Sequence, residues 1–305
     1  MKIKKSPLVS VIINCYNGER YLIECLKSVK NQTYKNWEVI FWDNQSTDKS
    51  KKIYLQFSKD KRFKYFYAKK FTTLYQARNL ALKKINGEIV TFLDTDDYWL
   101  PDKIEKQVDI FLKYKDVNLV YTNYKQIKKF FIFDIIKKRK LALYSGSICN
   151  ELLKNYSIAW LTVAIRNKKN FMKKNPFNEQ LDMVSDYDFT LRFSAKNNIY
   201  SINQYLAVNR QHSNQLSRNK FFDQAKHYCL WYKIIKKDKK ISNMKNFYFI
   251  KMRYEFYNAI QKINDTENFL EKLIIIQNIK NSVLKIKLIF FTLFSGIFIK
   301  YVMSL

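Results

Sequence analysis

Three carboxylates within four residues form the most chemically suggestive feature of this sequence. Asp94, Asp96 and Asp97 end an apolar run that begins at Glu88. Asp has poor β-propensity, and adjacent like charges repel unless a cation lies between them. In extended backbone Asp94 and Asp96 point to the same face, and hard oxygen ligands suit Mg²⁺ or Mn²⁺. The segment alone fits equally well a divalent-metal site at a strand end and a solvated, Asp-rich turn.

Alternating strands and helices are expected to position this cluster. Apolar β-branched and aromatic runs predict strands, and apolar residues at helical spacing predict helices between them. The predicted strands cover residues 8–13, 37–42 and 63–67 and the run from residue 88, and the predicted helices cover residues 19–31, 53–57 and 72–85. Ser46 or Thr47 is expected to cap the second helix. This order indicates an α/β fold with a doubly wound, mostly parallel sheet and helices on both faces.

Polar loops follow three of the predicted strands, at residues 14–17, 43–48 and 94–97. In open α/β sheets the ligand binds where such loops gather, outside the carboxyl ends of the strands. The expected convergence favours a ligand site at the acidic cluster over a plain turn.

Positive charge dominates the composition, with 56 Lys and Arg against 26 Asp and Glu in 305 residues and a formal net charge of +30. This charge first suggests an anionic membrane surface as partner. Most of the cations are lysines, whereas fork-shaped recognition of bases and phosphates favours Arg, so we do not expect nucleic acid as a partner. An AT-rich coding sequence would also enrich Lys, Asn, Ile, Phe and Tyr. Four scattered cysteines without a Cys-x-x-Cys pair indicate reduced thiols in a cytosolic protein.

Four segments share an order and spacing that identify a family. They are residues 9–17 (VSVIINCYN), the acidic loop at residues 43–48, Ala77-Arg78-Asn79, and residues 92–97 (FLDTDD). Together they resemble the family 2 glycosyltransferases with the GT-A fold, over roughly residues 8–215. The resemblance implies transfer of a sugar from a nucleotide-diphosphate donor, usually a UDP-sugar, to a hydroxyl of a glycan or lipid-linked acceptor in bacterial surface polysaccharide synthesis.

The resemblance also implies where the nucleotide binds. Its expected contacts are Asn14, Tyr16, Asn17, Asp43, Arg78, Asp94 and Thr95. Asp43 stands at the position of the acidic residue that contacts the nucleobase. The common form of that loop is Asp-Asp-Gly-Ser, and this chain has Asp43-Asn44-Gln45-Ser46. This departure leaves the identity of the nucleotide open.

For the reaction, the resemblance implies a general base at Asp186, where a structural helix cap is the alternative interpretation. Asp96 is expected to hold the Mn²⁺ or Mg²⁺, with His212 as a second ligand. Asp97, Asp188 and Trp160 are expected to support the site or the acceptor. Because Asp186 would take the proton while the acceptor hydroxyl attacks in line, the anomeric carbon would be inverted.

The second half of the chain has weaker patterns. Residues 125–143 are basic and aromatic without a clear period, which fits a variable loop on the acceptor side or a plain surface insertion, and residues 158–165 predict a strand. We expect a catalytic domain over residues 1–217 and a Lys-rich helical region over residues 218–305.

Residues 288–299 are twelve uncharged, mostly apolar residues between lysines. As a helix they would span about 18 Å, short of the roughly 30 Å hydrocarbon core. Residues 287–305 are therefore expected to lie in the inner face of the cell membrane, which would make the enzyme cytoplasmic and peripheral. A helix that packs on protein is the alternative.

Two other functions fit parts of the sequence. A nucleotidyltransferase with a related sheet would want a Gly-rich or cationic phosphate loop after the first strand, where only Gly18 occurs. A non-enzymatic, basic membrane- or nucleic-acid-binding protein gives no reason for three polar, acidic loops at strand ends.

Overall fold

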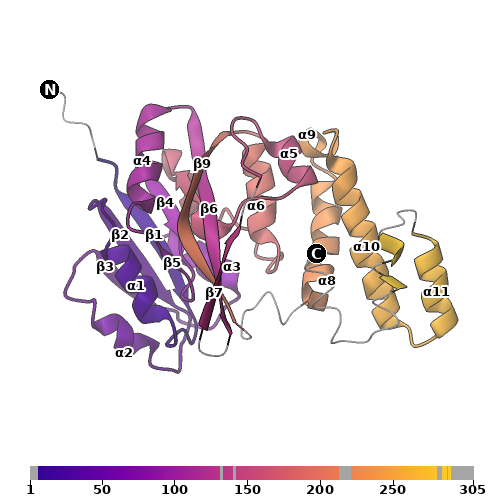
Figure 1. Cartoon of the computed structure of the whole chain (residues 1–305), viewed down its shortest axis with the longest axis horizontal. Helices are drawn as coiled ribbons and strands as arrows, with labels where there is room; N and C mark the ends of the chain where they lie inside the picture. The colour runs from indigo at the N-terminus through magenta and orange to yellow at the C-terminus, as the bar shows by residue number, and fades with distance from the viewer. Residues whose placement is uncertain are drawn as a thin grey trace. The chain divides into compact units, whose positions relative to one another are not determined.

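A computed structural model describes residues 6–130, 133–139, 142–212, 221–279, 284–286 and 288–289 (Figure 1). The chain divides into two compact units. The first unit comprises Met1–Glu179 and Ser185–His212, and the second comprises Gln180–Val184 and Ser213–Leu305. Every residue singled out above for binding or catalysis lies in the first unit.

Among the described residues, nine strands form one sheet in the first unit, in the order β3-β2-β1-β4-β8-β6-β9-β5, with β7 paired to β6. The strands are β1 (Val9–Cys15), β2 (Trp37–Asp43), β3 (Phe63–Tyr67), β4 (Ile89–Phe92), β5 (Tyr98–Trp99), β6 (Val117–Phe130), β7 (Phe133–Arg139), β8 (Ala164–Arg166) and β9 (Asn198–Gln211). The predicted α/β class is confirmed.

The sheet is parallel in one half and mixed in the other. Strands β3, β2, β1 and β4 run parallel to one another. Strand β8 is antiparallel to both β4 and β6, while β6 and β9 are parallel. The loops after β1, β2 and β4 therefore leave the sheet on the same side, at the carboxyl ends of these strands, as we expected.

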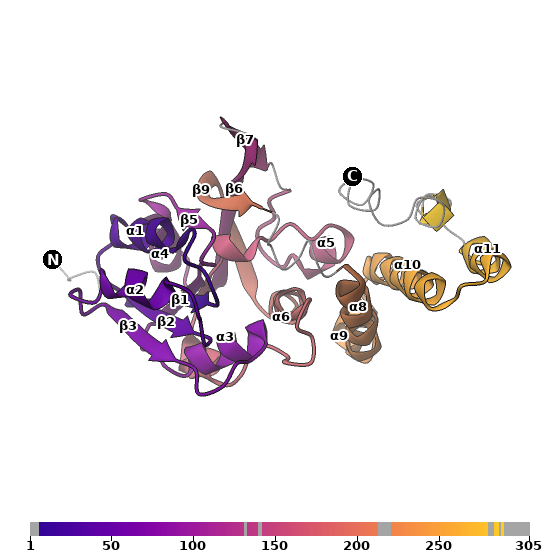
Figure 2. The same cartoon turned by 90° about the horizontal axis from the view of Figure 1, so that it is seen from below.

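Helices cover both faces of the sheet (Figure 2). The helices of the first unit are α1 (Leu22–Lys30), α2 (Ser50–Leu55), α3 (Leu74–Leu82), α4 (Lys103–Lys113), α5 (Cys149–Lys154) and α6 (Ser185–Ser194). Val9, Val11 and Ile13 of β1 share one buried cluster with Leu22 of α1 and Val108 of α4. Because side chains alternate along a strand, these three residues of β1 lie on one face, and Figure 2 shows α3 on the opposite side from α1 and α4.

The predicted cap of the second helix is wrong. Helix α2 begins at Ser50, and the structure gives Lys49 at its N-cap position no side-chain cap. Asp48 accepts a hydrogen bond from the Ser50 amide at 2.9 Å. Ser46 instead accepts one from the Asn17 amide at 3.1 Å, so its hydroxyl joins two loops rather than ending a helix.

The strand predicted over residues 158–165 is also wrong over most of its length. A 3-10 turn, η1 (Trp160–Thr162), precedes the short β8. The Thr162 hydroxyl closes this turn by donating to the Ala159 carbonyl at 2.6 Å. The Trp160 ring packs edge-on against Phe92 and Phe177, with ring centroids 4.9 and 5.3 Å away. Burial of this aromatic ring favours the turn over an extended strand at the start of the segment.

The segment at residues 125–143 is not a loop over its described residues. Strand β6 continues to Phe130, and β7 returns beside it with Tyr124 opposite Arg139 and Phe130 opposite Phe133. The register is that of an antiparallel hairpin, which we call the β6–β7 ribbon.

The second unit is helical, as predicted for the C-terminal region. Its helices are α8 (Phe221–Ile235), α9 (Lys239–Ser242), α10 (Phe247–Asp265) and α11 (Phe269–Gln277). Ile260 and Ile263 of α10 share a buried cluster with Ile276 of α11. In the part of the chain that the structure describes, no helix combines the length and apolar character needed to cross a membrane. The segment predicted to lie at the membrane, residues 287–305, falls outside the described residues except for Leu288 and Ile289.

Candidate active site

The loops after β1 and β2 are held together by hydrogen bonds. Asn17 accepts from the Thr47 amide at 2.8 Å, and its own amide donates to Ser46. Glu19 donates its amide to Asp48 at 2.9 Å and accepts from the Lys49 amide at 2.8 Å. These bonds fix the two loops to each other at the carboxyl ends of β1 and β2.

Asp43 lies at the end of β2 with its side chain fully buried. It accepts hydrogen bonds from the Ser46 amide at 2.7 Å and from the Tyr65 hydroxyl at 2.6 Å. Burial, followed by the bond to Asp43, raises the pKa of Tyr65, so Tyr65 remains a donor at neutral pH. Sequence reasoning missed Tyr65, which a pattern cannot link to Asp43 because it lies on the neighbouring strand.

Two exposed aromatic rings lie at the same edge of the sheet. Tyr16 after β1 and Phe71 after β3 are 54% and 56% exposed, and their ring centroids are 4.7 Å apart. Asn14 at the end of β1 has a buried Nδ2 that finds no hydrogen-bond partner among the described residues. This edge therefore offers an aromatic surface and an unused donor.

Arg78 connects helix α3 to the acidic cluster. Its guanidinium donates to the Asp94 carboxylate at 2.8 Å, and its side chain is only 4% exposed, whereas that of Asp94 is 44% exposed. Burial opposes the charge of Arg78, but the carboxylates of Asp94 and Asp186 favour it, and the net result is a raised pKa. Arg78 is thus a buried, permanent cation between two carboxylates.

Thr95 is packed against the first loop. A Cβ added to Gly18 would lie 3.0 Å from Thr95 Oγ1 and 3.2 Å from Cys15 Sγ. A larger residue at this position would crowd both side chains and force them to shift by a few tenths of an ångström.

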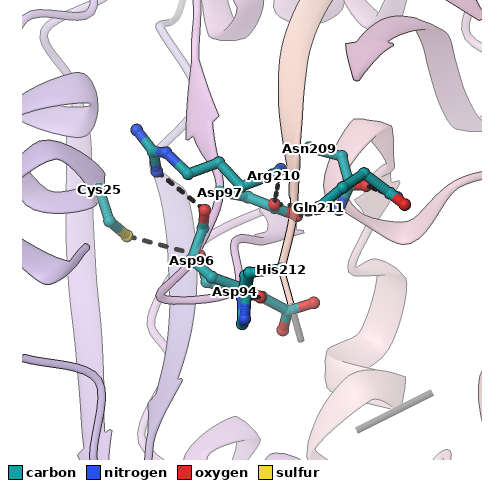
Figure 3. A network of polar contacts seen from close by, with 8 residues as sticks. All are labelled: Cys25, Asp94, Asp96, Asp97, Asn209, Arg210, Gln211 and His212. Atoms are coloured by element: carbon teal, nitrogen blue, oxygen red, sulfur yellow. Dashed lines mark hydrogen bonds and ion pairs between the residues drawn. The ribbon is translucent and has the colours of Figure 1, made fainter. Parts of the chain in front are cut away.

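Asp96 and His212 meet although 116 residues separate them. His212 Nε2 lies 2.9 Å from Asp96 Oδ2, and Arg210 donates to the Asp96 carbonyl at 2.8 Å (Figure 3). Burial, followed by the charge of Asp94, raises the pKa of Asp96. A carboxylate and an imidazole at this spacing offer an oxygen and a nitrogen ligand to one ion.

Asp97 points away from this pair and holds strand β9. It is 2% exposed and accepts from Asn209 Nδ2 and from the Arg210 amide, both at 3.0 Å (Figure 3). Burial, followed by the charge of Asp96, raises the pKa of Asp97 well above its usual range. Asp97 therefore fixes the segment that carries His212.

Asp186 lies in the first turn of α6, where it accepts from the Tyr187 amide at 2.7 Å. Burial raises the pKa of Asp186, while the charge of Arg78 and hydrogen bonds from the Tyr187 amide and from Tyr75 oppose that effect. A raised pKa makes Asp186 a stronger proton acceptor than an ordinary carboxylate. Sequence reasoning missed Tyr75, which lies one turn before Arg78 and just outside the motif Ala77-Arg78-Asn79.

Asn79 holds the segment that leads to α6. It accepts from the Phe177 amide at 3.2 Å, and its Nδ2 donates to the Phe177 carbonyl and to Glu179, both at 2.9 Å. The motif Ala77-Arg78-Asn79 contained this residue, although its positioning role required the structure.

Asp188 and Trp160 are two further predicted site residues, and the Arg78 guanidinium carbon lies 6.0 Å from the centroid of the Trp160 ring. Asp188 is 1% exposed and pairs with Arg192 one turn later in α6, at 2.5 Å. Trp160 belongs to the aromatic cluster around Phe177. Asp188 pairs within α6, and Trp160 packs against Phe189 of the same helix, so both stabilise α6 and its packing.

The residues around Asp96 fit a hard divalent ion with part of its coordination supplied by phosphate. Mg²⁺ and Mn²⁺ commonly bind through one or two protein ligands and the oxygens of a bound phosphate. Asp96 and His212 supply two ligands, and in the described part of the chain no cluster of three or more His, Cys, Asp and Glu is arranged to hold a metal.

Comparison with known proteins identifies the family. The family model described as glycosyl transferase family 2 matches residues 10–194. The chain is 34% identical over 216 residues to the UDP-Glc:alpha-D-GlcNAc-diphosphoundecaprenol beta-1,3-glucosyltransferase WfgD of Escherichia coli, which covers 70% of this chain and 81% of the relative. It is 32% identical over 219 residues to the putative teichuronic acid biosynthesis glycosyltransferase TuaG of Bacillus subtilis, covering 70% and 83%.

Among solved structures, TarS 1-349 of S. aureus in complex with UDP-GlcNAc superposes with a TM-score of 0.64 at 17% identity, covering 92% of this chain and 86% of TarS 1-349. The mannosyltransferase PcManGT of Pyrobaculum calidifontis, solved with GDP-Man and Mn²⁺, gives a TM-score of 0.57 at 16% identity, covering 90% and 79%. The fold is that of the GT-A enzymes. Because the family model covers more than half of the chain, including the loops after β1, β2 and β4 and the Asp186 turn, this chain belongs to glycosyl transferase family 2.

Proposed function

We propose that this enzyme is an inverting glycosyltransferase that moves a sugar from a UDP-linked donor to a hydroxyl of a lipid-linked glycan. One observation carries the proposal. Arg78 lies between two parts of the site. It forms an ion pair with Asp94 of the acidic cluster after β4, where the leaving diphosphate would bind, and its charge also acts on Asp186, a separate buried carboxylate at the start of α6. The two parts match the two tasks of sugar transfer, which are to stabilise a departing diphosphate and to accept a proton.

On the donor side, Asp43 and the rings of Tyr16 and Phe71 would bind the nucleoside, and Asn14 would use its unpartnered Nδ2. Asp96 and His212 would hold Mn²⁺ or Mg²⁺, which when bound supplies positive charge to the leaving diphosphate. The glycosyltransferase TarS binds UDP-GlcNAc, which supports a UDP-sugar as the donor class.

On the acceptor side, Asp186 would accept the proton of the attacking hydroxyl. A single carboxylate suffices for direct displacement, because no covalent sugar intermediate has to form. The acceptor class is supported by WfgD, whose name places its substrate sugar on diphosphoundecaprenol. A lipid-linked acceptor would require work at a membrane surface, and we include in the proposal a peripheral position on its cytoplasmic face, with residues 287–305 as one contact.

The test is sugar transfer by Asp186→Asn. General-base catalysis contributes about 10²- to 10⁴-fold, so turnover should fall by that factor. Thermal stabilisation by UDP with Mn²⁺ should persist, since Asp186 lies outside the proposed nucleotide site. Asp109→Asn, an exposed carboxylate on α4, is the matched control and should retain turnover. Near-normal transfer by Asp186→Asn refutes the assignment, and release of pyrophosphate in place of UDP would favour a nucleotidyltransferase.

A further inference from the structure

The β6–β7 ribbon exposes large apolar side chains on both of its faces. Phe133, Ile135 and Ile136 are 69%, 53% and 59% exposed. Because side chains alternate along a strand, Phe133 and Ile135 lie on one face and Ile136 on the other. Figure 2 shows β7 projecting from the first unit. A single exposed hydrophobe is ordinary, but three within four residues of a projecting strand mark an interaction surface.

The ribbon carries a concentration of positive charge along its length. Residues 125–139 contain six Lys and Arg and one acid, Asp134. Lys125 lies directly opposite Lys138 in the antiparallel register. Like charges in directly opposed positions destabilise a strand pair unless an anion lies between them. The ribbon therefore complements a surface that is apolar inside and negatively charged outside.

The length of the stretch that carries the exposed apolar side chains matches the interface of a bilayer. This stretch extends from the pair Ile127–Ile136 to the pair Phe130–Phe133, three residue steps or about 10 Å, and it also contains Lys128, Lys129 and Asp134. This length falls far short of the roughly 30 Å hydrocarbon core. It equals the depth of about 5–10 Å to which interfacial elements enter a membrane.

The ribbon leaves the sheet beside the active site. Strand β6 pairs in parallel with β9, with Lys128 opposite Gln211. The next residue along the chain is His212, 2.9 Å from Asp96. A bilayer that holds the ribbon would therefore lie close to Asp96 and His212.

We propose that the β6–β7 ribbon is a membrane-docking element that inserts Phe133, Ile135 and Ile136 into an anionic bilayer, with Lys125, Lys137 and Lys138 at the level of the lipid headgroups. The biological purpose of docking rests on the proposed lipid-linked acceptor. Docking itself requires no turnover, so its test is independent of the transfer reaction.

The first experiment measures sedimentation of the full-length protein with vesicles of phosphatidylglycerol and phosphatidylcholine, and with phosphatidylcholine alone. The variants are Ile135→Ser/Ile136→Ser and Lys137→Gln/Lys138→Gln. Each should weaken partition into the anionic vesicles at least about tenfold, since each removes two apolar or two cationic contacts. Matched controls on α2 are Leu55→Ser, whose parent side chain is 54% exposed, and Lys51→Gln/Lys52→Gln, and both should bind as the wild type does.

Three outcomes overturn the proposal. Ribbon variants that bind the anionic vesicles like the wild type show that another part of the chain does the docking. Loss of UDP-induced thermal stabilisation in the ribbon variants shows that the ribbon belongs to the nucleotide site. Reduced retention on DNA with unchanged vesicle binding shows that the surface serves nucleic acid.

The second experiment locates the inserted residue. All four native cysteines are buried, so a cysteine introduced at the ribbon can be labelled selectively in the folded protein. Ile135→Cys labelled with an environment-sensitive fluorophore should shift to shorter wavelength with anionic vesicles, and labelled Leu55→Cys should not. An unchanged spectrum at position 135 refutes insertion, whatever the result of the Asp186→Asn test.

Discussion

Arg78 favours the ionised form of the proposed base, Asp186, and removing its charge should move the pH dependence of transfer. Arg78→Met keeps a long apolar side chain in the buried site but deletes the guanidinium. The charge of Arg78 opposes the burial that raises the pKa of Asp186, so its loss raises that pKa further. A base works only when deprotonated, so the acidic limb of the pH–rate profile should move to higher pH.

The magnitude follows from the sharing of Arg78 between two carboxylates. A neighbouring opposite charge typically favours an ionised carboxyl by about 1.4–4 kcal/mol. Because Arg78 is paired directly with Asp94 at 2.8 Å, we take the low end of that range for Asp186. About 1.4 kcal/mol corresponds to a tenfold smaller ionised fraction. At a pH on the acidic limb, transfer by Arg78→Met should therefore fall about tenfold, and the deficit should shrink as the pH rises.

Asp94→Asn provides the opposite shift. The charge of Asp94 raises the pKa of Asp186, so its removal should move the acidic limb to lower pH, even if donor binding weakens. The assay is turnover at saturating donor from pH 5 to pH 9, with melting temperatures to confirm that each variant is folded. If the two variants shift the limb in the same direction, or leave it in place, the electrostatic link between Arg78 and Asp186 is wrong.

The structure makes three further predictions. Gly18→Ala should raise the KM for the donor several-fold, because its Cβ would crowd Thr95 and Cys15, and the double variant with Thr95→Ala should recover part of that loss. Asp97→Asn should raise the melting temperature at pH 8, by about 2–4 °C for each kcal/mol gained. Burial raises the pKa of Asp97 in the folded state above its value in the unfolded state. Ionisation of Asp97 therefore lowers the stability of the wild type as pH rises through the folded-state pKa. Below the unfolded-state pKa of about 4, Asp97 is protonated in both states, and the advantage of Asp97→Asn in melting temperature should vanish. Mn²⁺ should increase the thermal stabilisation given by UDP in the wild type but not in Asp96→Asn or His212→Asn, and an equal increase in all three proteins would place the ion elsewhere.

The first strands could be predicted from the sequence because each is an apolar run that ends in polar residues. Strand β3 has the predicted limits, and β1 and β2 extend the predicted runs by one or two residues at their carboxyl ends. These features depend on neighbours in sequence.

The remaining features depend on contacts between distant segments. Trp160 turned a β-like run into a 3-10 turn because its ring packs with Phe92 and Phe177. The β6–β7 ribbon escaped detection because neither face of β7 is buried, so its apolar residues show no alternation. The positions of Tyr65 beside Asp43 and of Asn79 beside Phe177 follow from strand order and tertiary packing, which a single sequence does not reveal.

The reversal of strand direction at β8 has an evolutionary consequence. The proposed nucleotide side is built from loops of β1, β2 and β4, while β6, β9 and β5 lie beyond the reversed strand, with β7 paired to β6. Hydrogen bonds that stabilise the first two loops do not involve the ribbon. Mutation can therefore reshape the ribbon while the donor loops keep their structure. If the ribbon docks on a membrane as proposed, residues 124–139 form a natural unit for exchange between relatives that work on different surfaces.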